Sequence, residues 1–192
     1  MDTHVRLLEV LTQGAVTAAE QLIGWRLYVI EPDGQRTGGP ILETEAYSQE
    51  DAASHTYRGK TKRNATMFGP PGHVYVYFTY GMHWCMNIVT GQEGHGQGVL
   101  IRAIAIDSGL DIVRGRRGPR PDRELTNGPA KVAQALGVLG ADNGAPLNHS
   151  RFILLPPHSA WNATVKATER IGISKDTHRL WRFIADEEST NR

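Results

Sequence analysis

The 192-residue sequence has little of what marks a secreted or membrane protein. Its single cysteine, Cys85, excludes an internal disulfide and fits a reducing compartment. No apolar run is long enough to span a bilayer. Residues 1–9 carry Asp2, His4 and Arg6 in place of the apolar segment of a secretory signal. We therefore expect a soluble, cytoplasmic protein that does not contact a membrane.

Several common catalytic frameworks are missing as well. The eight histidines show no metal-site spacing and there are no paired cysteines, which excludes a zinc site and a zinc deaminase. There is no nucleophile-elbow motif and no Rossmann glycine fingerprint after a strand. The glycine-rich segment 91–98 lacks the following Lys-Ser/Thr and helix of a phosphate-binding loop. We expect no metal and no cofactor.

The net charge of +1 gives only a weak overall field for binding a polyanion. The distribution of the charges is more informative than their sum. The basic residues gather in two clusters, which are Arg58, Lys60, Lys62 and Arg63, then Arg114, Arg116, Arg117, Arg120 and Arg123. Either cluster alone is typical of a solvated loop. Together they leave solvated loops and a polyanion-binding face as open alternatives.

Length and a hydrophobic content of 40% predict one globular domain spanning residues 1–192. Apolar spacing predicts short helices over 7–14, 17–23, 109–117 and 130–136, the second with Thr17 as its N-cap. Strands are predicted over 25–30, 35–45, 74–78, 83–89, 99–106, 151–155 and 180–184. The polar segment 48–67 is predicted to be a long loop with one helical turn. The fold class expected is mixed α+β: a curved, mostly antiparallel sheet surrounded by short helices, with a protruding β-hairpin.

The hairpin is the most distinctive stretch of the chain. A β-branched and aromatic run over 74–78 favours a strand, and Tyr80-Gly81 interrupts it with a residue that tolerates positive φ. Tyr80 would then lie beside the turn, where a partner could reach it. Taken alone, the hairpin is most simply a piece of ordinary sheet.

Two segments carry ionisable residues in unusual settings. Alternation along the strand 40–47 places Glu43, Glu45 and Tyr47 on one face, where two carboxylates can push their pKa values apart. A solvated edge strand explains the same pattern. Arg102 lies in an apolar strand and needs a carboxylate or a polyanion as its partner. Glu43 or Glu45 is the natural candidate, and a purely structural buried pair remains an alternative.

A series of short motifs runs in order along nearly the whole chain. They are Glu43-Thr44-Glu45-Ala46-Tyr47, Glu50-Asp51-x₃-His55, Arg63-Asn64-x₂-Met67-Phe68, Pro71-Gly72-x₂-Tyr75-Val76-Tyr77-x₂-Tyr80-Gly81-Met82-x₂-Cys85-Met86-Asn87, Leu100-Ile101-Arg102-Ala103, Asn127-Gly128-Pro129-Ala130-Lys131 and Arg170-Ile171-Gly172-Ile173. Together they resemble the 3-methyladenine DNA glycosylase family of the alkyladenine, or methylpurine, type. One departure is Ala105-Ile106, where family members often have Glu-Pro.

The resemblance implies a monofunctional DNA glycosylase of base excision repair, which would act as a monomer. Its partner would be double-stranded DNA containing damaged, alkylated or deaminated purines. Such an enzyme flips the damaged base out of the stack, hydrolyses the N-glycosidic bond and leaves an abasic site. By resemblance, Glu45 would deprotonate the water that attacks C1′, and Arg102 would help to orient that water.

The resemblance also implies roles for the residues around the base. Tyr47, His55 and Tyr77 would line the pocket and sandwich the flipped base, and Asn87 would disfavour guanine. Tyr75 is expected to be only a sheet residue. Tyr80 would enter the helix as a wedge. The residues expected to contact DNA outside the pocket are Tyr80, Met82, Arg58, Lys60 and Arg63.

Physical chemistry agrees with these roles, and rival hypotheses remain. Aromatic walls hold a purine by stacking and favour a cationic alkylpurine through cation–π attraction. A non-catalytic reader of damaged bases would keep the wedge and pocket but would not need Glu45. A bifunctional glycosylase would use an amine such as Lys131 or Lys62 as nucleophile. An RNA-binding β-domain would also expose aromatic side chains.

Overall fold

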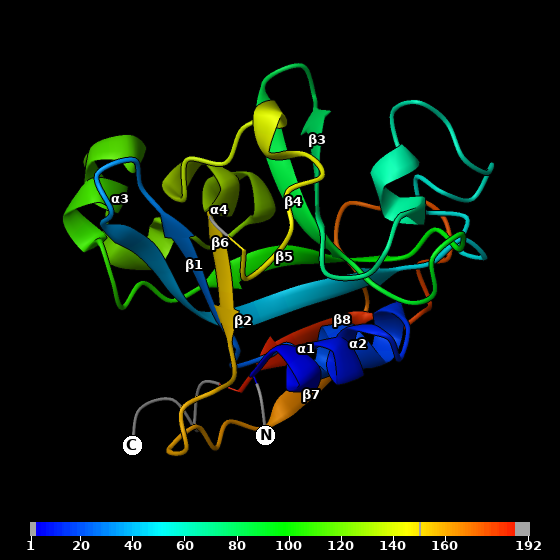
Figure 1. Ribbon diagram of the computed structural model, residues 1–192, viewed down its shortest axis with the longest axis horizontal. Helices are drawn as coiled ribbons and strands as arrows, with labels where there is room; N and C mark the ends of the chain where they lie inside the picture. The colour runs from blue at the N-terminus through cyan, green and yellow to red at the C-terminus, as the bar shows by residue number, and fades with distance from the viewer. Residues whose placement is uncertain (1–2, 150, 187–192) are drawn as a thin grey trace.

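The computed structural model describes residues 3–149 and 151–186, and a strongly curved antiparallel sheet forms its centre (Figure 1). Within these residues the strands are β1 (Arg26–Ile30), β2 (Arg36–Tyr47), β3 (Val74–Thr79), β4 (His83–Val89), β5 (Gly98–Ile104), β6 (Phe152–Leu155), β7 (Val165–Thr168) and β8 (Arg182–Ala185). The helices are α1 (Thr3–Leu11), α2 (Ala15–Gln21), α3 (Leu110–Arg117) and α4 (Pro129–Ala135). Short 3₁₀ turns cover Ala65–Phe68, Asp122–Glu124 and Gly140–Asp142. The predicted fold class is confirmed.

The long strand β2 organises the sheet. Its first part pairs with β1, and its second part lies between β5 and β8, which gives the strand order β3-β4-β5-β2-β1-β6. The strand β8 pairs with the edge of β2 opposite β5, and β7 pairs with β8. The change of partner occurs beside Gly38 and Gly39. A Cβ on Gly38 would lie 2.0 Å from the Leu27 carbonyl oxygen, and one on Gly39 would lie 2.4 Å from that of Ala105. Only glycine permits this close backbone approach.

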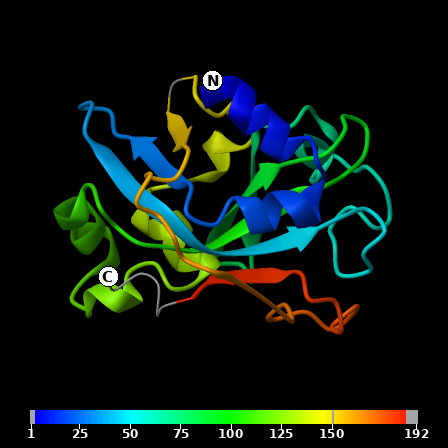
Figure 2. The same ribbon diagram turned by 90° about the horizontal axis from the view of Figure 1, so that it is seen from below.

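The helices α1 and α2 lie along one side of β2, and β8 lies along the other (Figure 2). Small side chains make this packing close, because Ala18 and Ala19 of α2 are fully buried. The Thr44 hydroxyl of β2 donates a 2.7 Å hydrogen bond to the Ala19 carbonyl, which fixes the helix against the strand. On the far part of the sheet α4 packs against β4 and β5. These layers bury the core and leave one end of β2 open to a cavity.

One local prediction is wrong, and one strand was not predicted. The helix α2 begins at Ala15 with Gly14 as its N-cap residue, so Thr17 is inside the helix. The N–H of Ala15, which has no partner within the helix, donates 2.8 Å to the side-chain oxygen of Gln97. Gln97 is distant in sequence and takes the place of a local capping side chain. The strand β7 was not expected from the sequence. The predicted long loop 48–67 is confirmed as irregular, with its one helical turn at Ala65–Phe68.

The strands β3 and β4 form the predicted hairpin, which projects from the sheet (Figure 1). Tyr80 and Gly81 have φ values of 52° and 67°, and the Met82 N–H donates 3.2 Å to the Thr79 carbonyl. Positive φ at both central positions is what a type I′ turn requires. Tyr80 is therefore held at the tip by backbone geometry that is unfavourable for its own side chain.

Within the described part of the chain, no helix is both long and apolar enough to cross a membrane.

Candidate active site

A cavity of about 320 Å³ lies between the carboxyl end of β2, the hairpin, the loop 48–67 and the loop between β7 and β8. This volume is within the range of small-molecule sites. The residues predicted to act on or bind the substrate all line it, and they are Glu45, Arg102, Tyr47, His55, Tyr77 and Asn87. The fold thus brings together side chains that are spread over more than fifty positions of the sequence.

Glu45 is the carboxylate of the cavity, and its side chain is fully buried. One oxygen, Oε1, accepts a 2.8 Å hydrogen bond from the backbone N–H of Ile171. The other, Oε2, accepts 2.8 Å from the Tyr47 hydroxyl and lies 3.3 Å from Nη1 of Arg102. These contacts fix the carboxylate in one orientation. Its burial rules out the solvated-edge interpretation of this strand.

Arg102 contacts both candidate carboxylates, because its Nε also donates 2.7 Å to Glu43. It lies at a β-bulge between β2 and β5: Ala103 pairs with Glu43 and Ile101 pairs with Thr44, so no β2 residue lies directly opposite Arg102. Burial alone would lower the pKa of Arg102, but the charges of Glu45 and Glu43 raise it above the ordinary value. The guanidinium therefore stays charged.

Aromatic rings form another part of the cavity lining. His55 meets Tyr77 edge-to-face with ring centroids 4.6 Å apart, and Tyr75 stacks on Tyr77 at 5.7 Å. His55 is exposed on its loop, yet desolvation by the protein around the ring, followed by the charge of Arg63, lowers the pKa of His55 and favours the neutral ring. The edges and faces of this cluster are suited to a flat, apolar-faced ligand.

Tyr75 does more than the sequence analysis predicted. It is a buried strand residue, as expected, but it also lines the cavity. Its hydroxyl lies 3.3 Å from Nδ1 of His55 and helps to hold that ring. The buried side chain of Asn87 pairs across the hairpin with Tyr75, donating 3.3 Å to the Tyr75 carbonyl. Tyr75 thus supports two residues of the pocket.

The sequence comparison decides the family. A model described as methylpurine-DNA glycosylase matches residues 9–189. The chain belongs to the methylpurine-DNA glycosylase family. This confirms the resemblance drawn from the motifs and places the chain among the DNA glycosylases that repair alkylated bases.

Three curated relatives of this chain are each named "Putative 3-methyladenine DNA glycosylase". The protein from Burkholderia lata is 52% identical over 149 residues, which cover 76% of this chain and 72% of the relative. That from Nitrosospira multiformis is 47% identical over 169 residues, covering 88% and 84%. That from Carboxydothermus hydrogenoformans is 47% identical over 156 residues, covering 81% and 82%. The similarity extends over most of each chain.

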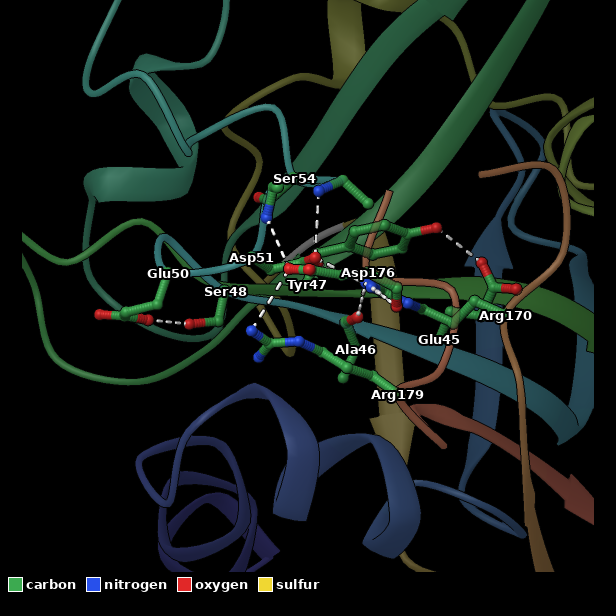
Figure 3. Close-up of polar contacts among 12 residues, drawn as sticks. Glu45, Ala46, Tyr47, Ser48, Glu50, Asp51, Ser54, Arg170, Asp176 and Arg179 are labelled. Carbon is green, nitrogen blue, oxygen red and sulfur yellow. Dashed lines mark hydrogen bonds and ion pairs between the residues drawn. The ribbon is translucent and has the colours of Figure 1, made fainter. Parts of the chain in front are cut away.

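Tyr47 of this glycosylase contacts charge on two sides. Burial, and after it the neighbouring charge of Glu45, raises the pKa of the Tyr47 hydroxyl. The hydroxyl therefore stays protonated and donates a hydrogen bond to Glu45. The guanidinium carbon of Arg170 lies 4.7 Å from the centroid of the Tyr47 ring (Figure 3). Tyr47 is therefore fixed both at its hydroxyl and through its ring.

Arg170 also joins the loop after β7 to the start of the loop 48–67. Its guanidinium makes a two-pronged ion pair with Asp51, with Nη2 donating 2.9 Å to Oδ1, and donates 3.0 Å to the Ala46 carbonyl (Figure 3). Asp176 accepts 2.9 Å from the Ala52 N–H. These bonds hold the adjacent Ile171 against Glu45. The sequence motif contained Arg170, but nothing in the sequence identified Asp51 as its partner.

We expect Arg170→Met to lower the free energy of unfolding by about 3–5 kcal/mol, because Asp51 would remain buried and unpaired. Urea denaturation measures the effect. Arg179→Met is the matched control, since the ion pair of Arg179 with Asp176 is partly exposed and should contribute about 1 kcal/mol or less. Equally small losses in both variants would contradict the assignment of Arg170.

The predicted DNA-contacting residues of the glycosylase lie on the hairpin tip and on the loop 48–67, and of these Tyr80 lines the cavity. Tyr80 and Met82 project from the hairpin tip with 82% and 67% of their surface exposed. Arg58, Lys60 and Arg63 are exposed on the loop 48–67, and Arg63 donates 3.2 Å to the Phe78 carbonyl. A second cavity of about 280 Å³ shares His55 and Tyr75 with the first. The cations lining it are Arg58, Arg63 and Lys175, of which sequence reasoning missed Lys175.

Three arginines of the second basic cluster make contacts within the protein. Arg114 pairs with Asp122 at 2.7 Å, and Arg116 pairs with Glu31 at 2.6 Å. Arg117 is buried and donates 2.9 Å to the Leu125 carbonyl. These contacts hold α3 in place, on the opposite side of the hairpin from the loop 48–67 (Figure 1). The solvated-loop interpretation is incorrect for the buried Arg117, whereas 49% of the Arg114 side chain is exposed, and polyanion binding by this cluster stays a prediction.

Proposed function

We propose that this family member hydrolyses the N-glycosidic bond of damaged purines in double-stranded DNA, with Glu45 activating the attacking water. It would act as a monomer on a base turned out of the helix. The observation that carries this proposal is a fully buried carboxylate, oriented by Tyr47, Arg102 and Ile171, facing into a cavity with aromatic walls.

The chemistry follows from where the groups lie. A purine stacked between Tyr47 and the His55–Tyr77 pair would place its sugar carbon near Glu45. Glu45 takes a proton from water as the water oxygen bonds to C1′, and the base leaves with the electrons of the C1′–N bond. The negative charge of the carboxylate also stabilises the positive charge that develops on the sugar. Arg102 orients this carboxylate and the water.

Substrate selection would rest on the walls of the cavity. Stacking accepts any purine and contributes about 1–3 kcal/mol per base. A cationic alkylpurine gains further attraction from the aromatic faces and is the better leaving group. Asn87 is buried and held by Tyr75, so it would meet the 2-amino group of guanine and disfavour normal guanine. These features favour damaged adenine-like purines.

The exposed residues would hold the DNA. Arg58, Lys60 and Arg63 would contact phosphates beside the lesion, which fixes the register without reading sequence. Tyr80 would insert into the stack and occupy the space of the flipped base, with Met82 beside it. The hairpin tip and the cavity mouth are adjacent, since Tyr80 lines the cavity as well.

A water nucleophile is favoured over a lysine. We call the cavity that Glu45 lines the base cavity. Among the described residues that line it there is no lysine. The Lys131 amine donates 2.8 Å to the Asn127 side chain, and Lys62 is exposed on its loop. An amine nucleophile would have to reach C1′ from inside the cavity.

A panel of lesion-bearing duplexes tests the function. Duplexes with hypoxanthine, ethenoadenine or 7-methylguanine are incubated with the protein and scored for free base, abasic sites and strand breaks. We expect free base and an abasic site from at least one lesion, no strand cleavage and no adduct trapped by borohydride. Binding without base release would instead support a non-catalytic reader, and a borohydride adduct would support a lysine nucleophile. Preference for single-stranded RNA would contradict the proposal altogether.

A further inference from the structure

Glu43 does not line the base cavity, but it is one contact away from the carboxylate that does. Its Oε1 accepts two charged hydrogen bonds, 2.7 Å from Nε of Arg102 and 2.6 Å from Nε of Arg182. Arg102 in turn lies 3.3 Å from Glu45. Charges of opposite sign therefore alternate along a row of side chains from β8 to the cavity. We refer to Glu45, Arg102, Glu43 and Arg182 as the charge row.

We infer that Glu43 is a positioning residue for base excision, acting by holding the Arg102 guanidinium against Glu45. The inference rests on the proposed function, because it assigns Glu43 a role in the reaction that Glu45 performs. Glu43 touches neither the base nor the water. Its effect passes through Arg102.

The backbone alone cannot fix the Arg102 guanidinium. Arg102 lies at the bulge between β2 and β5, where the ladder is interrupted, and its long side chain has several rotatable bonds. The fork of the guanidinium is instead held at two atoms, with Nε on Glu43 and Nη1 on Glu45. Removing the charge of Glu43 would leave Glu45 as the one carboxylate partner of Arg102 among the described residues and free the guanidinium to rotate about its stem.

Arg182 holds the Glu43 carboxylate in place with a second charged hydrogen bond. It comes from β8, shares the same Glu43 oxygen, and its Nη1 donates 3.3 Å to the Thr168 hydroxyl of β7. Both side chains are mostly buried, with 16% of Glu43 and 19% of Arg182 exposed. Because water is largely excluded, the ion pairs are screened less than surface pairs. The charge row thus connects β8 to the proposed catalytic carboxylate, Glu45.

Glu43→Gln tests this role, since glutamine keeps the size and an acceptor oxygen but removes the charge. We expect the single-turnover rate of base release to fall about 10–100-fold, as when outer partners of metal ligands are removed. Affinity for lesion DNA should stay nearly unchanged. The matched control is Glu31→Gln, which removes the charge of a mostly buried pair with Arg116, and neither residue lines the cavity. It should cost stability but leave the rate unchanged.

A double-mutant cycle with Arg102→Gln separates positioning from general destabilisation. If Glu43 acts through Arg102, Glu43→Gln should slow the Arg102→Gln variant little further. If Glu43→Gln prevents folding, Glu43→Asp keeps the charge but withdraws it from Arg102, and the same loss of rate is expected. A wild-type rate in both variants, or independent multiplying effects in the cycle, would overturn the inference. An active wild type with an unaffected Glu43→Gln variant refutes only this inference, whereas an inactive wild type refutes the proposed function.

Discussion

Replacement of Glu45 by glutamine should nearly abolish base release while leaving lesion binding intact. A general base contributes about 10²–10⁴-fold to a rate, and the amide of glutamine cannot take a proton from water. The amide oxygen can still accept the Ile171 N–H that now bonds to Glu45. Glu43 stays bonded to Arg102, so the guanidinium keeps a carboxylate partner. The loss should therefore lie in the chemical step and not in the fold.

Single-turnover release of free base, with a parallel titration of lesion DNA, measures this prediction. Glu50→Gln is the matched control, because Glu50 is in the adjacent loop but is exposed and bonds to Ser48 and His95 away from Glu45 (Figure 3). It should excise at the normal rate. Full activity of the Glu45→Gln variant would remove Glu45 from the mechanism, and a loss of binding as large as the loss of rate would indicate a structural role.

Local patterns in the sequence were enough to predict most of the sheet. The β-branched and aromatic runs of β3 and β4 and the turn at Tyr80-Gly81 gave the hairpin, because strand preference and turn geometry are both local. Thr17 was wrongly predicted as a cap because the actual partner of the first helical N–H, Gln97, is far away in sequence. The strand β7 was missed because it is short and pairs only with β8, without a buried alternating face.

The site shows the same division between local and distant information. Strand alternation puts Tyr75 and Tyr77 on one face, so the sequence did contain a signal for Tyr75 in the pocket. The orientation of Glu45 depends instead on Ile171, which comes from the loop after β7 and is held there by the Arg170–Asp51 pair. No periodicity or spacing predicts such a contact. The apolar setting of Arg102 was enough to predict Glu43 or Glu45 as its partner, whereas the partners of Glu45 and Arg170 in distant loops were identified only by the fold.

Tyr80→Asn should separate the stability of the hairpin from its action on DNA. Tyr80 has a φ of 52°, a conformation that costs a bulky residue about 1–2 kcal/mol and that asparagine adopts more readily. Asn148 already occupies it elsewhere in the chain, at a φ of 55°. With 82% of its surface exposed, Tyr80 contributes little burial. The free energy of unfolding should therefore stay the same or rise by about 1 kcal/mol.

The same variant should excise paired lesions more slowly, because asparagine cannot fill the space that a flipped base leaves. Loss of one stacked ring costs about 1–3 kcal/mol, or roughly 5–150-fold in rate. The control is the same lesion in a single strand, where no wedge is needed and the rate should change little. Single-turnover rates on both substrates, with thermal melting of both proteins, measure the prediction. Equal slowing on paired and unpaired lesions would place Tyr80 in the pocket and not in the helix. A stabilised but slow enzyme would show that the strained turn serves to present Tyr80 to the DNA.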